Sequence, residues 1–261
     1  MSVILVAGTV SPVSSRLRWP ARALQRPGYA ALTAAGAIAD DDAARLVTLG
    51  AAAERVSVTG DPRFDSVAAV VEAVPDGEPA RLLGLAGPTL VAGSTWPADE
   101  AVLLAAFASV RHAQPRARLV LVPHEPTPAH LDGIDAAADR LGLPVPHRFS
   151  SGPDPAATLV TVDRLGVLAT LYGAGIAAYV GGGFGRAGLH SVLEPAAWGL
   201  PVAFGPEWER SREAGVLQEA GAALAPRGGV GLQPVGTAAD GPPGGRDPGV
   251  GGGRQGPGAG R

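Results

Sequence analysis

The middle of the chain alternates short apolar segments with amphipathic ones, and this alternation limits the fold more than any other feature. The apolar segments are nearly continuous, as they are in strands buried on both faces of a parallel sheet. They lie at Thr89–Ala92, Arg118–Val122, Thr158–Val162, Ile176–Val180 and Pro201–Phe204. Because such strands need helices on both sides, the pattern predicts an α/β fold with one near-complete Rossmann-like domain.

The segments between these strands predict helices. Pro97–Glu100 places a proline and two carboxylates in a first turn, and Leu103, Phe107 and Val110 then recur at helical spacing. Further helices are expected near Leu131–Leu141, Leu165–Tyr172, His190–Trp198 and Trp208–Ala220.

Residues 1–58 have a different character and predict part of a second Rossmann-like domain. A strand is expected at Val3–Val6 and another at Val56–Val58, with an Arg-rich stretch from Arg16 to Arg26. A helix should begin at the three carboxylates of Asp40–Asp42, which suit a helix N-terminus. We therefore divide the chain into a partial domain (1–58), a near-complete domain (59–226) and a tail (227–261).

The tail is rich in Gly and Pro and contains almost no large apolar residue. Such a segment cannot bury enough surface to offset the entropy of ordering, so we expect it to be disordered. A second hypothesis is that the coding sequence is read out of frame beyond about Arg227.

Composition excludes several classes of function. The chain has no cysteine, which rules out disulfides, thiolate metal sites and cysteine nucleophiles. A net charge of -3 gives no electrostatic reason to expect a nucleic-acid partner. No stretch reaches the roughly 20 apolar residues that a membrane span needs, so any membrane contact should be peripheral. His124 and His130 lack further ligands at zinc spacing, and we expect neither a metal nor a cofactor.

In open α/β sheets ligands bind at the carboxyl ends of the strands, so the loops after the strands are the candidate sites. Ser94 and Thr95 follow one strand, where small residues and a helix start suit a phosphate or a simple helix cap. His124 and Glu125 follow the next strand as a stiff polar pair or a solvated turn.

A third loop, Gly181–Gly183, would let the backbone approach a ligand closely. The predicted helix after it carries His190, Ser191 and Glu194 in its first turn. There Glu194 would accept hydrogen bonds from both ribose hydroxyls, or it would only complement the helix dipole.

The combined motifs resemble those of bacterial 3-deoxy-D-manno-octulosonic acid (Kdo) transferases, which are GT-B enzymes. The resemblance spans about residues 3–226, with the motifs in the same order and at compatible spacing. The segments that carry it are Thr59–Asp65, Ala92–Trp96, Val122–Pro126, Gly181–Gly183 and His190–Pro206. It implies an inverting glycosyltransferase of lipopolysaccharide core synthesis at the cytoplasmic face of the bacterial inner membrane. The donor would be CMP-Kdo and the acceptor a lipid A precursor.

The resemblance also assigns roles to residues. Ser94 and Thr95 would face the phosphate or the Kdo carboxylate, and Gly182, Gly183 and His190 would form the donor loop. The CMP contacts would fall at His124 and Glu125, at Leu165, Gly166 and Val167, and at Ser191, Val192, Leu193 and Glu194. At Val167 the carboxylate that the family carries is absent.

The family's general base has no counterpart here. In the family it is a Glu in a Gly-Glu motif of the acceptor domain, whereas the only Glu of residues 1–58 is Glu54, just before a strand. We therefore expect a fragment that binds CMP or CMP-Kdo weakly, does not transfer Kdo and exposes apolar edges. Two alternatives stay open: a GT-B enzyme or epimerase that uses a UDP-sugar, and a truncated product without enzymatic function.

Overall fold

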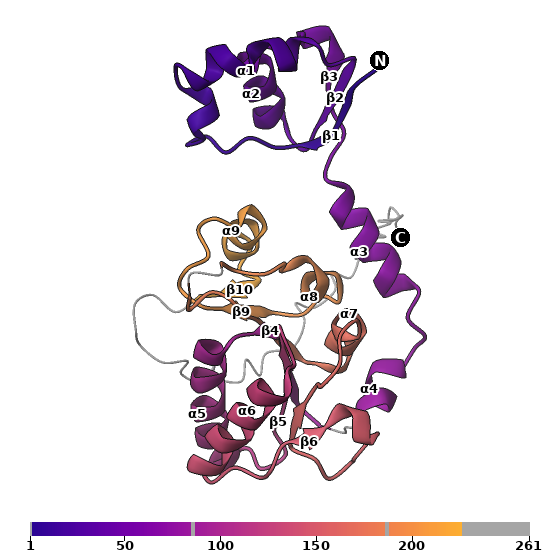
Figure 1. Cartoon of the computed structure of the whole chain (residues 1–261). Helices are drawn as coiled ribbons and strands as arrows, with labels where there is room; N and C mark the ends of the chain where they lie inside the picture. Colours follow the sequence, from indigo (N-terminus) through magenta and orange to yellow (C-terminus); the bar gives the residue numbers. More distant parts are fainter. Residues whose placement is uncertain (1, 85–86, 186–187, 226–261) are drawn as a thin grey trace, which may run out of the picture.

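The computed structural model describes residues 2–84, 87–185 and 188–225, which form two α/β units joined by helix α3 (Pro62–Glu72) (Figure 1). The N-terminal unit contains a parallel sheet in the order β1 (Ile4–Gly8), β2 (Ala34–Ala37) and β3 (Val56–Val58). Helices α1 (Ala21–Ala30) and α2 (Asp40–Leu49) lie on the same side of this sheet. A small core that includes Ala35, Leu46 and Leu49 fills the space beneath them.

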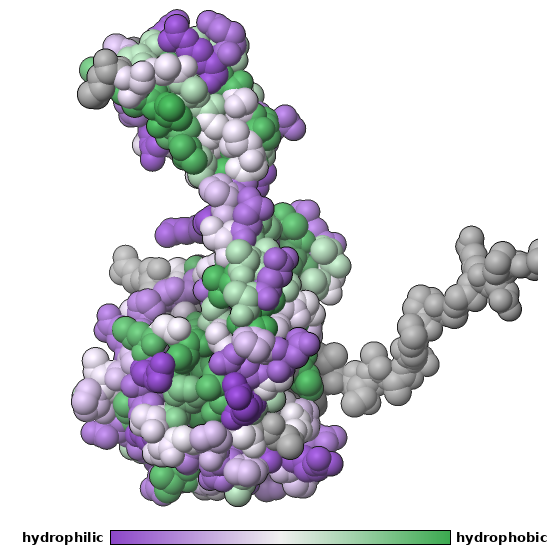
Figure 2. Space-filling model, turned by 90° about the vertical axis from the view of Figure 1, so that its right-hand side faces the viewer, coloured by the Kyte–Doolittle hydropathy of each residue, from purple (hydrophilic) through white to green (hydrophobic). Residues whose placement is uncertain are grey.

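Among the residues that the structure describes, no helix covers the other side of the N-terminal sheet. Ile4 and Val6 of β1 are 63% and 69% exposed, and Val58 of β3 is exposed as well. Figure 2 shows apolar surface on this side of the unit. This side of the sheet is therefore partly apolar and exposed, and the expectation of exposed apolar edges stays a prediction.

The C-terminal unit contains a seven-stranded sheet in the order β10-β9-β8-β4-β5-β7-β6, and every pairing is parallel. Its strands are β4 (Thr89–Thr95), β5 (Arg118–Pro123), β6 (His147–Arg148), β7 (Leu159–Thr161), β8 (Ala177–Val180), β9 (Val202–Phe204) and β10 (Ala223–Leu224). The five strands expected from the apolar runs are confirmed, and the two-residue edge strands β6 and β10 were not anticipated.

Both faces of this sheet are buried, as a parallel sheet requires. Leu119 and Leu121 of β5 contribute to one core cluster, and Val120 between them contributes to the other. Helices α5 (Pro97–Ala113) and α6 (Pro128–Arg140) supply the first cluster with side chains such as Leu104 and Ile134. The short helices α4 (Glu78–Leu83) and α7 (Leu168–Leu171) cover the second.

Several helix boundaries differ from the expectation. The helix expected at 165–172 is reduced to α7, and the one expected at 208–220 is α9 (Arg212–Glu219). The helix expected at 190–198 begins only at Leu193, as α8 (Leu193–Ala197). His190 cannot join it, because its backbone N–H donates to the carbonyl of Gly181 and its ring accepts a hydrogen bond from Trp96. The expected disordered tail (227–261) lies outside the described residues, and the division at residue 58 stays a prediction.

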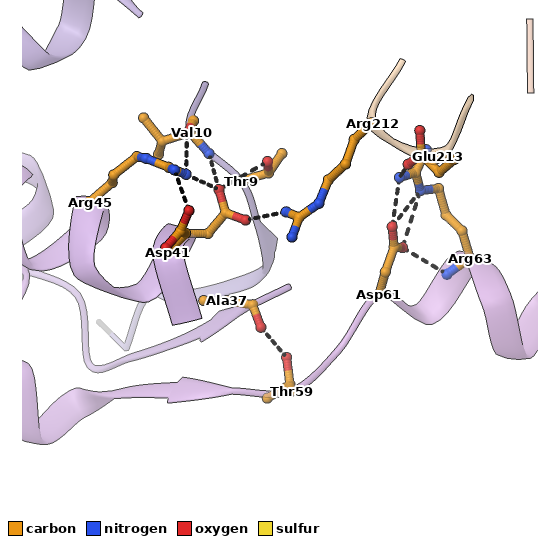
Figure 3. A network of polar contacts seen from close by, with 11 residues as sticks. Thr9, Val10, Ala37, Asp41, Arg45, Thr59, Asp61, Arg63, Arg212 and Glu213 are labelled. Carbon is orange, nitrogen blue, oxygen red and sulfur yellow. Dashed lines mark hydrogen bonds and ion pairs between the residues drawn. The ribbon is translucent and has the colours of Figure 1, made fainter. Parts of the chain in front are cut away.

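Polar contacts connect the two units near the start of α9 (Figure 3). The Arg212 guanidinium lies 2.8 Å from a carboxylate oxygen of Asp42 at the start of α2. The other Asp42 oxygen accepts from the backbone N–H of Val10 at 2.9 Å. Arg63 of α3 pairs with Asp61 and also with Glu213 of α9. These contacts set how the N-terminal unit sits over the carboxyl edge of the larger sheet.

Candidate functional site

The carboxyl ends of β4, β5 and β8 lie side by side at one edge of the large sheet, and the loops that follow them pack tightly together. Ser94, near the end of β4, has a left-handed backbone with a φ of 52°. A Cβ added at Gly181 would overlap the carbonyl oxygen of Ser94. The β8 loop can therefore approach the end of β4 only because residue 181 has no side chain.

Three rings from three loops pack together at this edge. The ring centroids of Trp96 and His124 are 4.9 Å apart, and those of His124 and His190 are 4.5 Å apart. The Trp96 indole N–H donates to Nε2 of His190 at 3.1 Å, so His190 is neutral with its proton on Nδ1. Burial lowers the pKa of His190, and the neighbouring His124 lowers it further. The structure thus brings together the two histidines that the sequence indicated.

A buried carboxylate ties two of these loops together. Asp99 in the first turn of α5 is 1% exposed and accepts three hydrogen bonds. The donors are the backbone N–H groups of Trp96 and Gly182, each at 3.0 Å, and the Tyr179 hydroxyl at 2.6 Å. Burial and the hydrogen bond that the Tyr179 hydroxyl donates to Asp99 raise the pKa of Tyr179. Asp99 therefore fixes the β8 loop against the start of α5.

The expected role of the glycine loop is corrected by this packing. Gly182 and Gly183 are buried, and the N–H of Gly182 already donates to Asp99. An added Cβ at Gly182, whose φ is 94°, would overlap the carbonyl of Gly188, and one at Gly183 would meet Gly205. The glycines allow backbone segments to pack on one another, and the Gly182 amide is not available to a phosphate.

Thr95 is a second correction. Its side chain is fully buried, and its hydroxyl donates to Glu100 at 2.8 Å. The other Glu100 oxygen lies 2.9 Å from Nε2 of His130. Thr95 therefore belongs to a buried polar cluster beneath the loop, and Ser94 is the residue of this pair that remains partly accessible.

Glu194 lies in the first turn of α8 and is half-buried. Burial raises the pKa of its carboxyl, and no hydrogen bond or ion pair to another described residue opposes that shift. Burial first, and then the charge of Glu194, raise the pKa of Tyr172. The Tyr172 hydroxyl packs against Gly93 of β4. Glu194 thus has no hydrogen-bond or ion-pair partner among the described residues, and its charge acts on Tyr172.

The remaining predicted residues divide into accessible and buried ones. Leu165 is 73% exposed, and Ser191 and Glu125 are exposed too. Gly166 has a left-handed φ of 82°. The side chains of Val192 and Leu193 are buried, and Val167 packs against the core. Within the described residues no group of three or more His, Asp or Glu side chains is placed to hold a metal ion.

A cavity of about 260 Å³ lies at the junction of the two units, beside this site. Its lining is mainly apolar and includes Arg212 and two carboxylates. It is lined by Ile38, Asp61, Phe64, Leu193, Ala196, Arg212, Glu213, Val216 and Leu217. Of the residues predicted to contact the nucleotide, Leu193 lines this cavity.

Sequence reasoning missed the residues that organise the site. The Pro97–Glu100 segment indicated a helix start, but not that Asp99 would bind a loop 83 positions away. Trp96 lies within a motif of the resemblance, yet its contacts with His124 and His190 depend on the fold. An acid three residues after an aromatic residue at a helix start was the available signal.

Two Rossmann-like units facing each other, with a ligand edge at the carboxyl ends of the larger sheet, define a GT-B type fold. A solved UDP-GlcNAc 2-epimerase from Neisseria meningitidis shares it, with a TM-score of 0.55 and 13% identity over 82% of this chain and 55% of that one. Residues 1–66 match the family model described as 3-deoxy-D-manno-octulosonic-acid transferase (kdotransferase).

Two curated Kdo transferases are similar in sequence. The one from Aquifex aeolicus is 34% identical over 122 residues, which cover 47% of this chain and 33% of the relative. The one from Bordetella pertussis is 32% identical over 197 residues, which cover 72% of this chain and 44% of the relative. The chain belongs to the Kdo transferase family, and it spans less than half the length of these relatives. Within the described residues no helix is long and apolar enough to cross a membrane.

Proposed function

We propose that the larger unit binds a cytidine nucleotide-sugar, CMP-Kdo, at the edge formed by Ser94, His124, His190 and Glu194. The observation that carries the proposal is Glu194, a half-buried carboxylate with a raised pKa and no partner among the described residues. A carboxylate is held in such a place at a cost in stability, unless a ligand supplies donors. The two hydroxyls of a ribose are suitable donors, because a carboxylate can accept from both.

The neighbouring loops suit the rest of a nucleotide. The stacked rings of Trp96 and His124 offer an aromatic surface beside the carboxylate. Ser94 lies at the end of β4, where its hydroxyl can reach a phosphate or the carboxylate of the sugar. His190 is held neutral by Trp96, so it can donate from Nδ1 without carrying a charge.

The activity that this site serves is proposed to be transfer of Kdo from CMP-Kdo to a lipid A precursor at the cytoplasmic face of the inner membrane. Family membership supports this activity. Inverting transfer needs a base near the acceptor oxygen. Residues 2–58 contain a single Glu, Glu54, which lies in the turn Ala53–Arg55 before β3. We therefore propose that these 261 residues alone bind the donor but do not transfer it.

The test compares CMP with UDP by isothermal titration into the purified chain. CMP should bind, and UDP should bind more weakly. His124→Gln should weaken CMP binding, and His112→Gln, which changes an exposed histidine at the end of α5, should not. Tighter binding of UDP would favour a UDP-sugar enzyme of the same fold, and no binding of either nucleotide would refute the donor site. Kdo transfer by the chain alone would refute the proposal that the chain does not transfer the donor, and it would leave the proposed donor site in place.

A further inference from the structure

We propose that His130 and Glu100 are positioning residues for the donor site. They form a buried link between the two loops that carry Ser94, Trp96 and His124. The inference rests on the proposed donor site and deepens it, because neither residue of the link is among those expected to contact the nucleotide.

The link runs between the first turns of α5 and α6, which lie side by side (Figure 1). Nε2 of His130 lies 2.9 Å from one carboxylate oxygen of Glu100, and the Thr95 hydroxyl donates to the other oxygen at 2.8 Å. Nδ1 of His130 lies 2.9 Å from the carbonyl oxygen of Glu125. A continuous path of polar contacts therefore leads from the end of β4 to the loop after β5.

Both ends of the link are next in sequence to residues that we propose face the nucleotide. Thr95 lies between Ser94 and Trp96, and Glu125 follows His124. The loop after β5 has no regular secondary structure at residues 124–127, and a backbone hydrogen bond from His124 to the Thr95 carbonyl, at 2.9 Å, connects it to β4. The side-chain link adds a second connection, and it holds the loop from which the His124 ring reaches Trp96.

Hydrogen-bond chemistry fixes the protons of the link. A backbone carbonyl can only accept, so Nδ1 of His130 carries a proton. The contact between Nε2 and Glu100 holds one more proton, on the nitrogen or on the oxygen, because two lone pairs would otherwise face each other. In either arrangement the pair as a whole is uncharged. Both ring nitrogens are engaged, so His130 can act on a ligand only through the loops that it connects.

Burial gives His130 a second effect, on stability, which the test must separate from positioning. Glu100 is 4% exposed and the His130 side chain 16% exposed. Removing one partner of a buried pair leaves the other without compensation and destabilises the fold. Replacing His130 alone therefore changes stability and loop position together. Replacing Glu100 with Gln in the same chain removes the uncompensated acid but does not restore the contact with the Glu125 carbonyl.

The experiment measures urea unfolding and calorimetric CMP binding of the full chain for three variants. His130→Ala should lose stability and weaken CMP binding on the order of 10-fold, which is about the contribution of one hydrogen bond. His130→Ala with Glu100→Gln should recover most of the stability and keep the weakened CMP binding. Glu100→Gln alone should keep the wild-type affinity, because the amide can donate to Nε2 of a neutral His130 and accept from Thr95.

A spectroscopic measurement on the free protein tests the positioning directly. The ring proton NMR signals of His124 and His190 should shift in both variants that lack His130, and they should stay in place in Glu100→Gln. The matched control is His147→Ala, which removes another half-buried histidine of the larger unit, whose Nε2 lies 2.7 Å from the carbonyl oxygen of Gly152. It should change neither CMP binding nor the His124 and His190 signals.

The outcomes separate this proposal from the donor site itself. If the wild-type chain binds CMP and the double variant binds it equally well, the link does not position the site and this proposal alone is overturned. Equal loss of CMP binding in Glu100→Gln or in His147→Ala, or unchanged His124 and His190 signals in both variants without His130, would overturn it as well. Absence of CMP binding by the wild-type chain would overturn the donor site and the positioning role with it.

Discussion

Replacing Glu194 with Gln should raise the stability of the free protein and at the same time remove its response to CMP. The folded protein holds a half-buried carboxylate without a partner among the described residues, at a cost of about 1 kcal/mol. Gln has nearly the same shape and no charge, so most of that cost disappears. For a protein of this size 1 kcal/mol corresponds to a rise in Tm of about 2–4 °C.

The response to ligand should move in the opposite direction. At a CMP concentration of about 100 times Kd, binding stabilises the wild-type protein by about 2.7 kcal/mol, or roughly 5–10 °C in Tm. Hydrogen bonds to a charged acceptor contribute about 1.5–3 kcal/mol, so Gln should weaken CMP binding about 10- to 150-fold. With a 100-fold loss the same CMP concentration would stabilise the variant by only about 0.4 kcal/mol.

The assay is differential scanning fluorimetry with and without CMP, and the matched control is Glu219→Gln, at an exposed acid near the end of α9. The control should keep the wild-type Tm and CMP response. The pKa of Glu194 is raised in the folded state, so the wild-type protein loses stability as pH rises from the unfolded pKa through the folded one. The gain in Tm from Glu194→Gln should therefore be small at acid pH and full at neutral pH. A fall in Tm for the free variant, or an unchanged CMP response, would refute the reasoning.

Three further outcomes are expected from urea unfolding. Gly182→Ala should lose about 1–3 kcal/mol of unfolding free energy because of its positive φ and the overlap with a neighbouring carbonyl, whereas Gly133→Ala, inside α6 and in open space, should gain about 0.5–1 kcal/mol. Asp99→Ala should lose about 3–5 kcal/mol, because it leaves three donors without their acceptor, and Asp99→Asn, which retains an acceptor, should lose much less. Burial raises the pKa of Asp42, but hydrogen bonds, including that from Arg212, outweigh burial and lower the pKa overall. The stability that the Asp42 carboxylate contributes is therefore present above its unfolded pKa and is lost as pH falls through its folded pKa. Asp42→Asn should therefore cost about 1–3 kcal/mol at pH 7 and progressively less toward acid pH.

Most of the fold could be predicted from the spacing of apolar residues, because buried parallel strands appear in the sequence as apolar runs. Each interior strand is buried on both faces, so its run of apolar residues stands out from the segments around it. The elements that were missed lack this signal. Helix α1 contains Pro27, β2 is the small-residue sequence Ala34–Ala37, and β6 and β10 are two residues long. Their structure depends on packing partners elsewhere in the chain.

The position of a site residue could be predicted where it follows a strand. Its role could not be predicted where that role depends on tertiary contacts. His124 and His190 come from two of the loops expected to line the crevice, and their ring centroids lie 4.5 Å apart. Thr95 ends β4 and Gly182 follows β8, but tertiary contacts with Glu100 and Asp99 engage their polar groups. Whether Glu194 contacts a ribose stays a prediction, because hydrogen bonding to a ligand cannot be derived from the chain alone.

The most direct measurement is a proton NMR titration of the five histidine side chains with CMP. If a cytidine nucleotide binds at the carboxyl edge of the large sheet, the ring signals of His124 and His190 should shift together and saturate at one Kd. His112 and His147, which lie away from the stacked rings, should not shift. Saturable shifts confined to other histidines, or no shift at any of the five, would contradict the assignment of this edge as the donor site.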